Sequence, residues 1–101
     1  MKRPVPMATK LEAKHIGENL STWRRLYRLS SEDVSERAAV SRATISRLEN
    51  GDPSVSFATF LNVCRSVGIL DMVVEATDPY ETDLGRARAD QLIPQRVRRK
   101  G

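Results

Sequence analysis

The spacing of apolar residues along the chain predicts an all-helical protein. Between about residue 15 and residue 28, apolar side chains recur at i, i+4, i+7 and i+11, which places them on one stripe of a helix. These residues are Ile16, Leu20, Trp23 and Tyr27. We therefore expect a first helix over this stretch, with the stripe, Trp23 included, packed in the core.

Two short helical patterns follow, and each begins with a hydroxyl residue that can cap a helix. Ser30 precedes the first, and Asp33 stands three residues later, where a capping box needs a side-chain acceptor. Ser41 precedes the second, and Asn50-Gly51 ends it. The predicted helices span residues 31–38 and 42–49, with inward positions at Val34, Ala38, Val40, Ile45 and Leu48. Two such helices joined by a turn at 39–40 are typical of the helix-turn-helix unit, whose second helix enters the DNA major groove.

A fourth helix is predicted between a Ser56 cap and Gly68, and a short fifth helix from Ile69 to Ala76. The fourth presents one apolar face made of Phe57, Phe60, Leu61, Cys64 and Val67. The fifth carries Ile69, Leu70, Met72, Val73 and Val74, which do not fit one narrow stripe. A helix that is apolar on more than one side needs more than one surface to pack against. We expect one face to close the domain and these residues to form a two-fold dimer contact, with coverage by the C-terminal tail as the alternative.

The two ends of the chain differ from this central part in composition. Residues 1–14 hold two prolines and four basic side chains, so we expect a flexible basic arm that either follows a DNA groove or is only a solvated terminus. Residues 78–81, Asp-Pro-Tyr-Glu, form a helix-start signal, and the weak amphipathic pattern after them is interrupted at Gly85 and ended by Pro94. The predicted organisation is an arm at 1–14, a helical domain at 15–77 and a charged tail at 78–101.

The net charge of +4 and the pI of about 9.7 suit a polyanionic partner. Five acids and no base lie between Asp71 and Asp83, whereas six bases and only Asp90 lie between Arg86 and the end. The charges of these two segments nearly cancel. Residues 1–70 therefore carry most of the net charge.

Several classes of protein are excluded. The single cysteine, Cys64, rules out an intramolecular disulfide and a multi-cysteine zinc site, and its place on a helical face favours a buried structural thiol. The single histidine, His15, has no second group for a catalytic or metal site, so we expect neither an enzyme nor a cofactor. No apolar run approaches the ~18 residues of a membrane span, and no apolar leader segment follows Met1. We expect a soluble, cytoplasmic protein.

The outer face of the helix at 42–49 offers groups that can contact DNA. These are Arg42, Ala43, Ser46 and Arg47. Each arginine can donate two hydrogen bonds to guanine O6 and N7, worth roughly 1–3 kcal/mol of base discrimination, while a phosphate contact or a solvated side chain is the alternative. Ala43 can only touch a thymine methyl group. Ser41 and Thr44, beside the helix N–H groups, suit a phosphate, and Arg28 is a further phosphate candidate.

The segment LSSEDVSERAAVSRATISRLENG at 29–51 resembles the helix-turn-helix of the Cro/C1-type (Xre) family of phage and bacterial regulators. The resemblance covers roughly Ile16 to Val74. It implies a five-helix, lambda-repressor-like domain that binds palindromic operators as a homodimer and acts as a repressor.

By position, the resemblance makes Arg42, Ala43 and Arg47 the base readers. It makes Ser31, Ser41, Thr44 and Asn50 phosphate contacts, and it pairs Arg24 with Glu49 as a structural ion pair. Ala39 departs from the family, which usually has glycine in the turn. An alanine with positive φ there would cost roughly 1 kcal/mol.

The segment GILDMVVEATDPYETDLGRARADQLIPQRVRRK at 68–100 is similar to the C-termini of Xre proteins encoded beside HipA-like serine/threonine kinases, as HipB-type antitoxins are. This resemblance implies the antitoxin and autorepressor of a toxin–antitoxin pair, whose second surface binds the toxin kinase. Two alternatives remain open. One is a stand-alone or phage-type regulator, and the other is a protein-interaction module with a degenerate helix-turn-helix.

Overall fold

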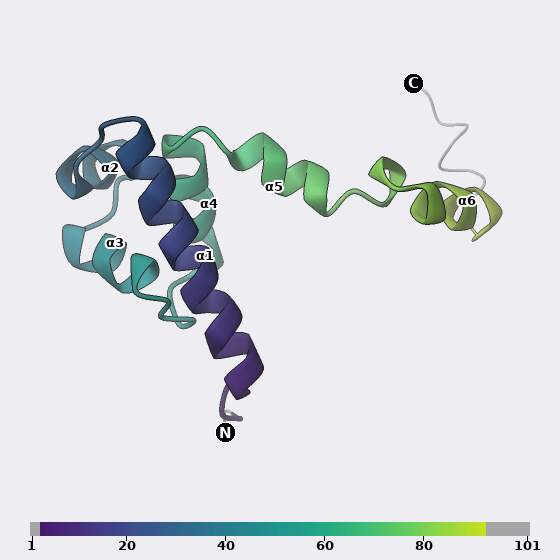
Figure 1. Cartoon of the computed structure of the whole chain (residues 1–101), viewed down its shortest axis with the longest axis horizontal. Helices are drawn as coiled ribbons and strands as arrows, with labels where there is room; N and C mark the ends of the chain where they lie inside the picture. The colour runs from purple at the N-terminus through teal and green to yellow at the C-terminus, as the bar shows by residue number, and fades with distance from the viewer. Residues whose placement is uncertain (1–2, 93–101) are drawn as a thin grey trace. The chain divides into compact units, whose positions relative to one another are not determined.

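The computed structural model of the protein describes residues 3–92, and all of their regular structure is helical (Figure 1). The elements are α1 (Met7–Leu26), α2 (Ser31–Ala38), α3 (Arg42–Glu49), α4 (Phe57–Ser66), α5 (Leu70–Ala76), the 3-10 helix η1 (Pro79–Glu81) and α6 (Asp83–Leu92). No strand occurs within the described range, in agreement with the all-helical class. None of the described helices combines the length and the apolar character that crossing a membrane requires. The predicted stop at Pro94 and the basic tail after it lie outside the described residues.

The chain divides into two compact units, Met1–Leu70 and Asp71–Gly101. The first contains α1 to α4, and the second contains η1, α6 and all of α5 except its first residue. The sequence pattern placed the boundary after residue 77, whereas this division falls inside the predicted fifth helix. That helix buries none of its residues.

The helices of the first unit begin at caps that the sequence predicted. The Ser30 hydroxyl accepts a hydrogen bond from the Asp33 N–H at 3.0 Å, and the Asp33 carboxylate accepts one from the Ser30 N–H at 2.8 Å. Ser41 accepts from the Thr44 N–H at 3.1 Å, and Ser56 caps α4 in the same way. Each cap satisfies an N–H group that the first turn of a helix leaves without an internal partner.

The first four helices all end at a left-handed residue. These residues are Arg28 (φ 58°), Ala39 (φ 59°), Gly51 (φ 84°) and Gly68 (φ 78°). After α1, the Leu29 N–H donates to the Arg24 carbonyl oxygen at 3.0 Å, the six-to-one bond of a Schellman motif, and equivalent bonds close the other three helices. Glycine takes this conformation without strain, whereas the Cβ atoms of Arg28 and Ala39 oppose it.

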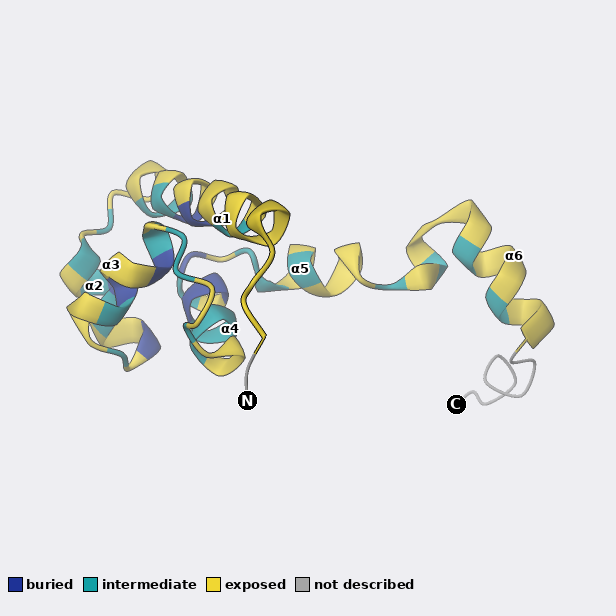
Figure 2. Ribbon diagram, turned by 90° about the horizontal axis from the view of Figure 1, so that it is seen from below, coloured by how far each residue is buried: buried dark blue, intermediate teal, exposed yellow. Residues whose placement is uncertain are grey.

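The core of the first unit lies where its four helices face one another (Figure 2). Helix α1 packs against α3, and α2 packs against both α3 and α4. The buried apolar side chains are Leu20, Val34, Ala38, Ile45, Leu48, Val63, Cys64 and Val67. The sequence pattern predicted all of them except Val63, which shares a helical face with Cys64 and Val67.

Two glycines let α1 lie directly on the end of α3. A Cβ atom at Gly17 would stand 2.5 Å from the Leu48 carbonyl oxygen and 2.6 Å from that of Glu49. A Cβ atom at Gly51 would stand 2.6 Å from the Cα of Lys14. Both separations are below any real contact, so this crossing has no room for a side chain at either position.

Helix α1 begins at Met7 rather than near His15, so the expected flexible arm at 1–14 is wrong from Met7 onward. Residues 7–14, MATKLEAK, are mostly strong helix formers, and Pro6 occupies the N-cap position, where its missing N–H does no harm. The two prolines and the basic side chains had favoured a flexible arm over a helix in the sequence pattern. The helix also gains support at Lys14, which lies against Gly51.

Three aromatic or aliphatic residues predicted for the core are instead exposed. Ile16 is 44 % exposed, Tyr27 54 % and Phe57 71 %. Tyr27 follows the last residue of α1, so the helical stripe no longer sets its direction, and Phe57 is the first residue of α4. Trp23 is half-buried and stacks on Tyr27 with the ring centroids 6.0 Å apart.

In the second unit, the predicted helix start at 78–81 forms only the short helix η1. The Asp78 carboxylate caps it by accepting from the Tyr80 N–H at 2.9 Å. A new helix, α6, begins after Thr82, whose hydroxyl oxygen accepts a hydrogen bond from the Gly85 N–H at 2.9 Å. Gly85 therefore lies inside α6 and does not interrupt it. A Cβ atom there would stand 2.0 Å from the Pro79 carbonyl oxygen, so glycine is what allows α6 to pack on η1.

Candidate nucleic-acid interface

Helix α3 buries one face and exposes the other. Ile45 is fully buried and Leu48 is 8 % exposed, and both face the core. The four predicted base-contact residues, Arg42, Ala43, Ser46 and Arg47, are all exposed. Their spacing of i, i+1, i+4 and i+5 places them on one side of the helix. The structure therefore brings all four together on one outward face.

The N-terminus of α3 carries two hydroxyl groups that already bond to each other. The Ser41 and Thr44 hydroxyl oxygens are 2.9 Å apart, and Ser41 also accepts from the Thr44 N–H. One hydroxyl donates in this pair, which leaves the other hydroxyl hydrogen free to point outward. Both predicted phosphate residues thus stand at the positive end of the helix dipole, where an anion is favoured.

Arg24 and Glu49 form a bidentate ion pair between α1 and the end of α3. Arg24 Nε donates to Glu49 Oε2 at 2.8 Å, and Nη2 donates to Oε1 at 3.1 Å. The side chains are only 15 % and 12 % exposed. The hydrogen bonds that Arg24 donates to the Glu49 carboxylate raise the pKa of Arg24 against the opposing effect of burial. Arg24 Nη1 also donates to the Leu29 carbonyl oxygen at 3.0 Å, so one side chain ties together α1, α3 and the link to α2.

Arg47 has partners in the loop after α3. Its Nε donates to Asp52 Oδ2 at 2.9 Å, and its Nη2 donates to the Ser54 hydroxyl at 3.3 Å. The Asp52 carboxylate also accepts from the Ser54 hydroxyl and N–H. Hydrogen bonds from Ser54, and then the Arg47 guanidinium, hold the pKa of Asp52 at about 2. The sequence pattern treated 52–54 only as a loop and missed these partners, because it gave no reason to connect Arg47 with Asp52.

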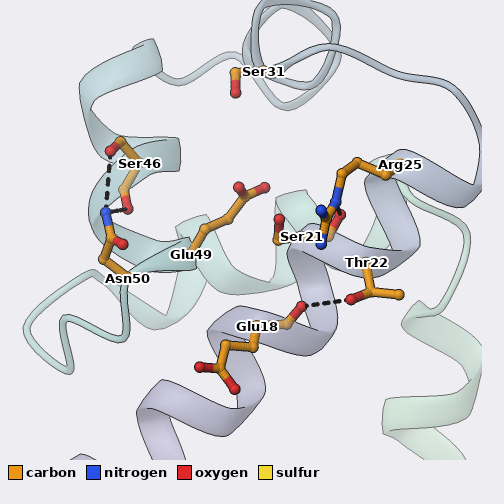
Figure 3. Close-up of a pocket in the computed structure, with 8 residues that line it drawn as sticks. All are labelled: Glu18, Ser21, Thr22, Arg25, Ser31, Ser46, Glu49 and Asn50. Carbon is orange, nitrogen blue, oxygen red and sulfur yellow. Dashed lines mark hydrogen bonds between the residues drawn. The ribbon is translucent and has the colours of Figure 1, made fainter.

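Asn50 folds back onto α3. Its side-chain amide nitrogen donates to the Ser46 carbonyl oxygen at 2.9 Å and lies 3.3 Å from the Ser46 hydroxyl (Figure 3). The predicted base residue Ser46 and the predicted phosphate residue Asn50 are therefore neighbours. A phosphate contact through the Asn50 amide nitrogen would have to share it with Ser46 or replace that bond.

An open polar groove of about 340 Å³ lies beside this face of α3. Its lining comprises Glu18, Ser21, Thr22, Arg25, Ser31, Ser46, Glu49 and Asn50 (Figure 3). The groove brings the predicted phosphate residue Ser31, the first residue of α2, to the same surface as α3. The exposed Arg28 lies in the link that precedes α2. Helix α1 also lines the groove, through Ser21, Thr22 and Arg25. The sequence analysis did not predict these residues as part of the site, because the sequence showed only that they lie outside the apolar stripe of α1.

A protein-family model described as a helix-turn-helix domain matches residues 15–76, which is more than half of the chain. The chain belongs to the helix-turn-helix domain family. The helix-turn-helix itself is α2, the turn at Ala39 and Val40, and α3, as the two short sequence patterns predicted. A domain of this family indicates DNA binding. No curated protein and no solved structure matches the chain.

The helix-turn-helix match extends through α5, which carries the predicted dimer residues Ile69, Leu70, Met72, Val73 and Val74. Within this set, Met72 is 48 % exposed and Val74 60 % exposed, while the others are partly covered. Their role in a dimer stays a prediction.

Proposed function

We propose that the protein is a sequence-specific transcriptional repressor of the Cro/C1 type, which binds a palindromic operator as a homodimer. The observation that carries this proposal is the outer face of α3, where Arg42 and Arg47 stand exposed opposite the buried Ile45 and Leu48. No acidic residue of α3 occurs before Glu49, and Glu49 is occupied by Arg24. The two arginines give this face of α3 a positive charge that favours approach to the polyanionic groove.

The contacts divide into those that read bases and those that position the protein. Arg42 and Arg47 have the fork of donors that matches guanine O6 and N7, and Ala43 and Ser46 fill the space between them. Ser41 and Thr44 offer hydroxyls at the helix N-terminus, and Arg28, Ser31 and Asn50 complete the set of proposed phosphate contacts. The Arg24–Glu49 pair is structural in this proposal, because it holds α3 at its angle to α1.

A homodimer fits the apolar character of α5. Met72 and Val74 are exposed apolar side chains that project from opposite sides of this short helix, so a partner could cover more than one of its faces. A two-fold axis would place the same patch of each copy against the other, and would set two α3 helices at the spacing of the operator half-sites. Replacing both residues by lysine should produce monomers in light scattering, whereas a dimer that persists would remove α5 from the interface.

The DNA-reading role is tested with an operator selected from randomised duplexes. Arg42→Ala should weaken binding to the selected operator by roughly tenfold, because a bidentate arginine–guanine contact contributes ~1–3 kcal/mol of discrimination. Binding to random duplexes should fall much less. Arg65→Ala, the same loss of charge at an exposed position on α4, is the matched control and should leave the ratio unchanged. Equal loss on operator and random DNA would show that Arg42 does not read bases.

A second function is proposed for residues 71–101, namely docking to a HipA-like serine/threonine kinase toxin. It is supported by the division of the chain, since residues 71–101 form a unit distinct from the one that carries α3. It also draws on the likeness of residues 68–100 to HipB-type C-termini. The test is co-purification with a HipA-like kinase encoded in the adjacent reading frame, and the absence of any such kinase would favour a stand-alone regulator.

A further inference from the structure

The two outward arginines of α3 are held in different ways. Arg47 donates through Nε to Asp52 Oδ2 at 2.9 Å and through Nη2 to the Ser54 hydroxyl at 3.3 Å. Arg42, on the same face, has no hydrogen-bond or ion-pair partner among residues 3–92. One arginine is therefore restrained by the loop after α3, and the other is free to change rotamer.

The acceptor that restrains Arg47 is itself fixed. Asp52 Oδ1 accepts from the Ser54 N–H at 2.9 Å and from the Ser54 hydroxyl at 2.7 Å. The Asp52 N–H donates to the Arg47 carbonyl oxygen at 2.9 Å, which ties Asp52 to the end of α3. The hydrogen bonds that the Asp52 carboxylate accepts from Ser54, and then from Arg47, lower its pKa to about 2.

The partners of Arg47 occupy only one edge of its guanidinium group. Nε and Nη2 form the edge that faces Asp52 and Ser54. The other edge, with Nη1 and the second hydrogen of Nη2, has no partner among the described residues. That edge presents two parallel N–H donors, which is the geometry that guanine O6 and N7 accept in the major groove.

We propose that Asp52 and Ser54 position Arg47 to read a guanine, and so set base specificity at one position of each half-site. This inference rests on the proposed DNA-binding function and adds two residues outside α3 to it. A side chain that is already held in its bound geometry loses less conformational entropy on binding than a free one. A guanidinium plane that is held in one orientation can also donate to fewer alternative base edges. Fixing Arg47 should therefore raise base discrimination more than it raises affinity.

The experiment uses the full chain and the operator selected from randomised duplexes, together with every single-base change of that operator. Arg47→Ala should remove roughly tenfold discrimination at one guanine position. Asp52→Asn should lower discrimination at the same position by roughly threefold or more and leave the position read by Arg42 unchanged. Its affinity for random duplexes should stay equal or rise, because a negative charge near DNA is removed. Glu36→Gln, the same charge change at an exposed site on α2, is the matched control and should alter no base preference.

A merely structural role of the loop predicts a different pattern. If Asp52→Asn weakens all duplexes by one factor, Asp52 holds the loop and does not position a base reader, and the proposal is overturned. Arg47→Lys keeps the charge and loses the fork, so it must lose the same base preference as Arg47→Ala; retained preference also overturns the proposal. Failure of the unmodified protein to select any sequence would instead overturn the proposed DNA-reading function itself.

Discussion

At the scale of single residues, Ala39 shows how a local departure from glycine is tolerated. Its φ of 59° and ψ of 42° lie in the left-handed region, and the turn between α2 and α3 keeps its closing hydrogen bond from the Val40 N–H to the Ser35 carbonyl oxygen. An alanine in place of the usual glycine could be accommodated either by this strain or by a change in the turn. The turn is unaltered, so the strain of the alanine Cβ is borne by the folded state.

Replacing Ala39 by glycine should therefore stabilise the protein by about 1 kcal/mol, because relief of the left-handed strain exceeds the extra backbone entropy of glycine in the unfolded chain. Urea unfolding followed by circular dichroism measures this. Ala43→Gly, the same change at an exposed position within α3, should lower stability, since glycine is unfavourable inside a helix. Destabilisation by both changes would show that the Ala39 turn is not strained.

The carboxylates of Asp33 and Asp52 should make the stability of the fold depend on pH in the acid range. Hydrogen bonds from Ser30 lower the pKa of Asp33, and those from Ser54, with Arg47, lower the pKa of Asp52 to about 2. A folded-state pKa below the unfolded value means that the stabilisation is complete above the unfolded pKa of ~3.9 and disappears as the pH falls through the folded value. Asp52→Asn should thus be less stable than the natural chain at pH 6, and the gap should close toward pH 2. A gap that is constant from pH 6 to pH 2 would contradict this assignment.

At the scale of elements, the crossing of α1 over α3 sets how the outer face of α3 is presented. Gly17 and Gly51 let the two backbones meet, and the Arg24–Glu49 pair joins the same helices with its charges largely shielded from water. Gly17 and Arg24 belong to α1, which precedes the helix-turn-helix. The position of α3 is therefore decided by α1 as much as by its own turn.

Gly17→Ala should lower the free energy of unfolding by about 2 kcal/mol. Alanine has better helix propensity by up to ~1 kcal/mol, but the contact of its Cβ with the Leu48 and Glu49 carbonyl oxygens would force the two backbones apart, and overpacking typically costs ~1–3 kcal/mol. Because the shift moves α3, operator affinity should fall as well. Asn19→Ala, at an exposed position of the same helix, is the control and should be neutral or stabilising. A stabilised Gly17→Ala variant would refute the close crossing.

At the scale of the whole molecule, the two units differ in charge. Residues 1–70 contain eleven Lys and Arg against seven Asp and Glu, and residues 71–101 contain six of each. The unit that carries α3 thus holds the entire net charge of +4. The first unit therefore has the charge that suits a polyanionic partner, and the second unit is neutral overall.

Deletion of residues 78–101 separates the two proposed functions. The slope of log affinity against log salt, about −0.9 per phosphate neutralised, should stay the same, because the proposed phosphate contacts all belong to the first unit. Binding to a HipA-like kinase should be lost. The deletion keeps α5, so a dimer formed through it should persist. A markedly shallower slope would place DNA contacts in the deleted segment, and retained kinase binding would remove it from the docking surface.

The features that could be predicted from the amino-acid sequence depend on residues close together in the chain. The Ser30–Asp33 box, the Ser41 and Ser56 caps, the glycine ends at 51 and 68 and the inward Ile45 and Leu48 are all short-range, because capping and helical periodicity act within one or two turns. The left-handed Arg28, the buried Val63 and the attachment of Arg47 to Asp52 became clear only from the folded structure. These depend on which backbones approach each other and on which way a side chain turns, and neither is encoded in the period of apolar residues.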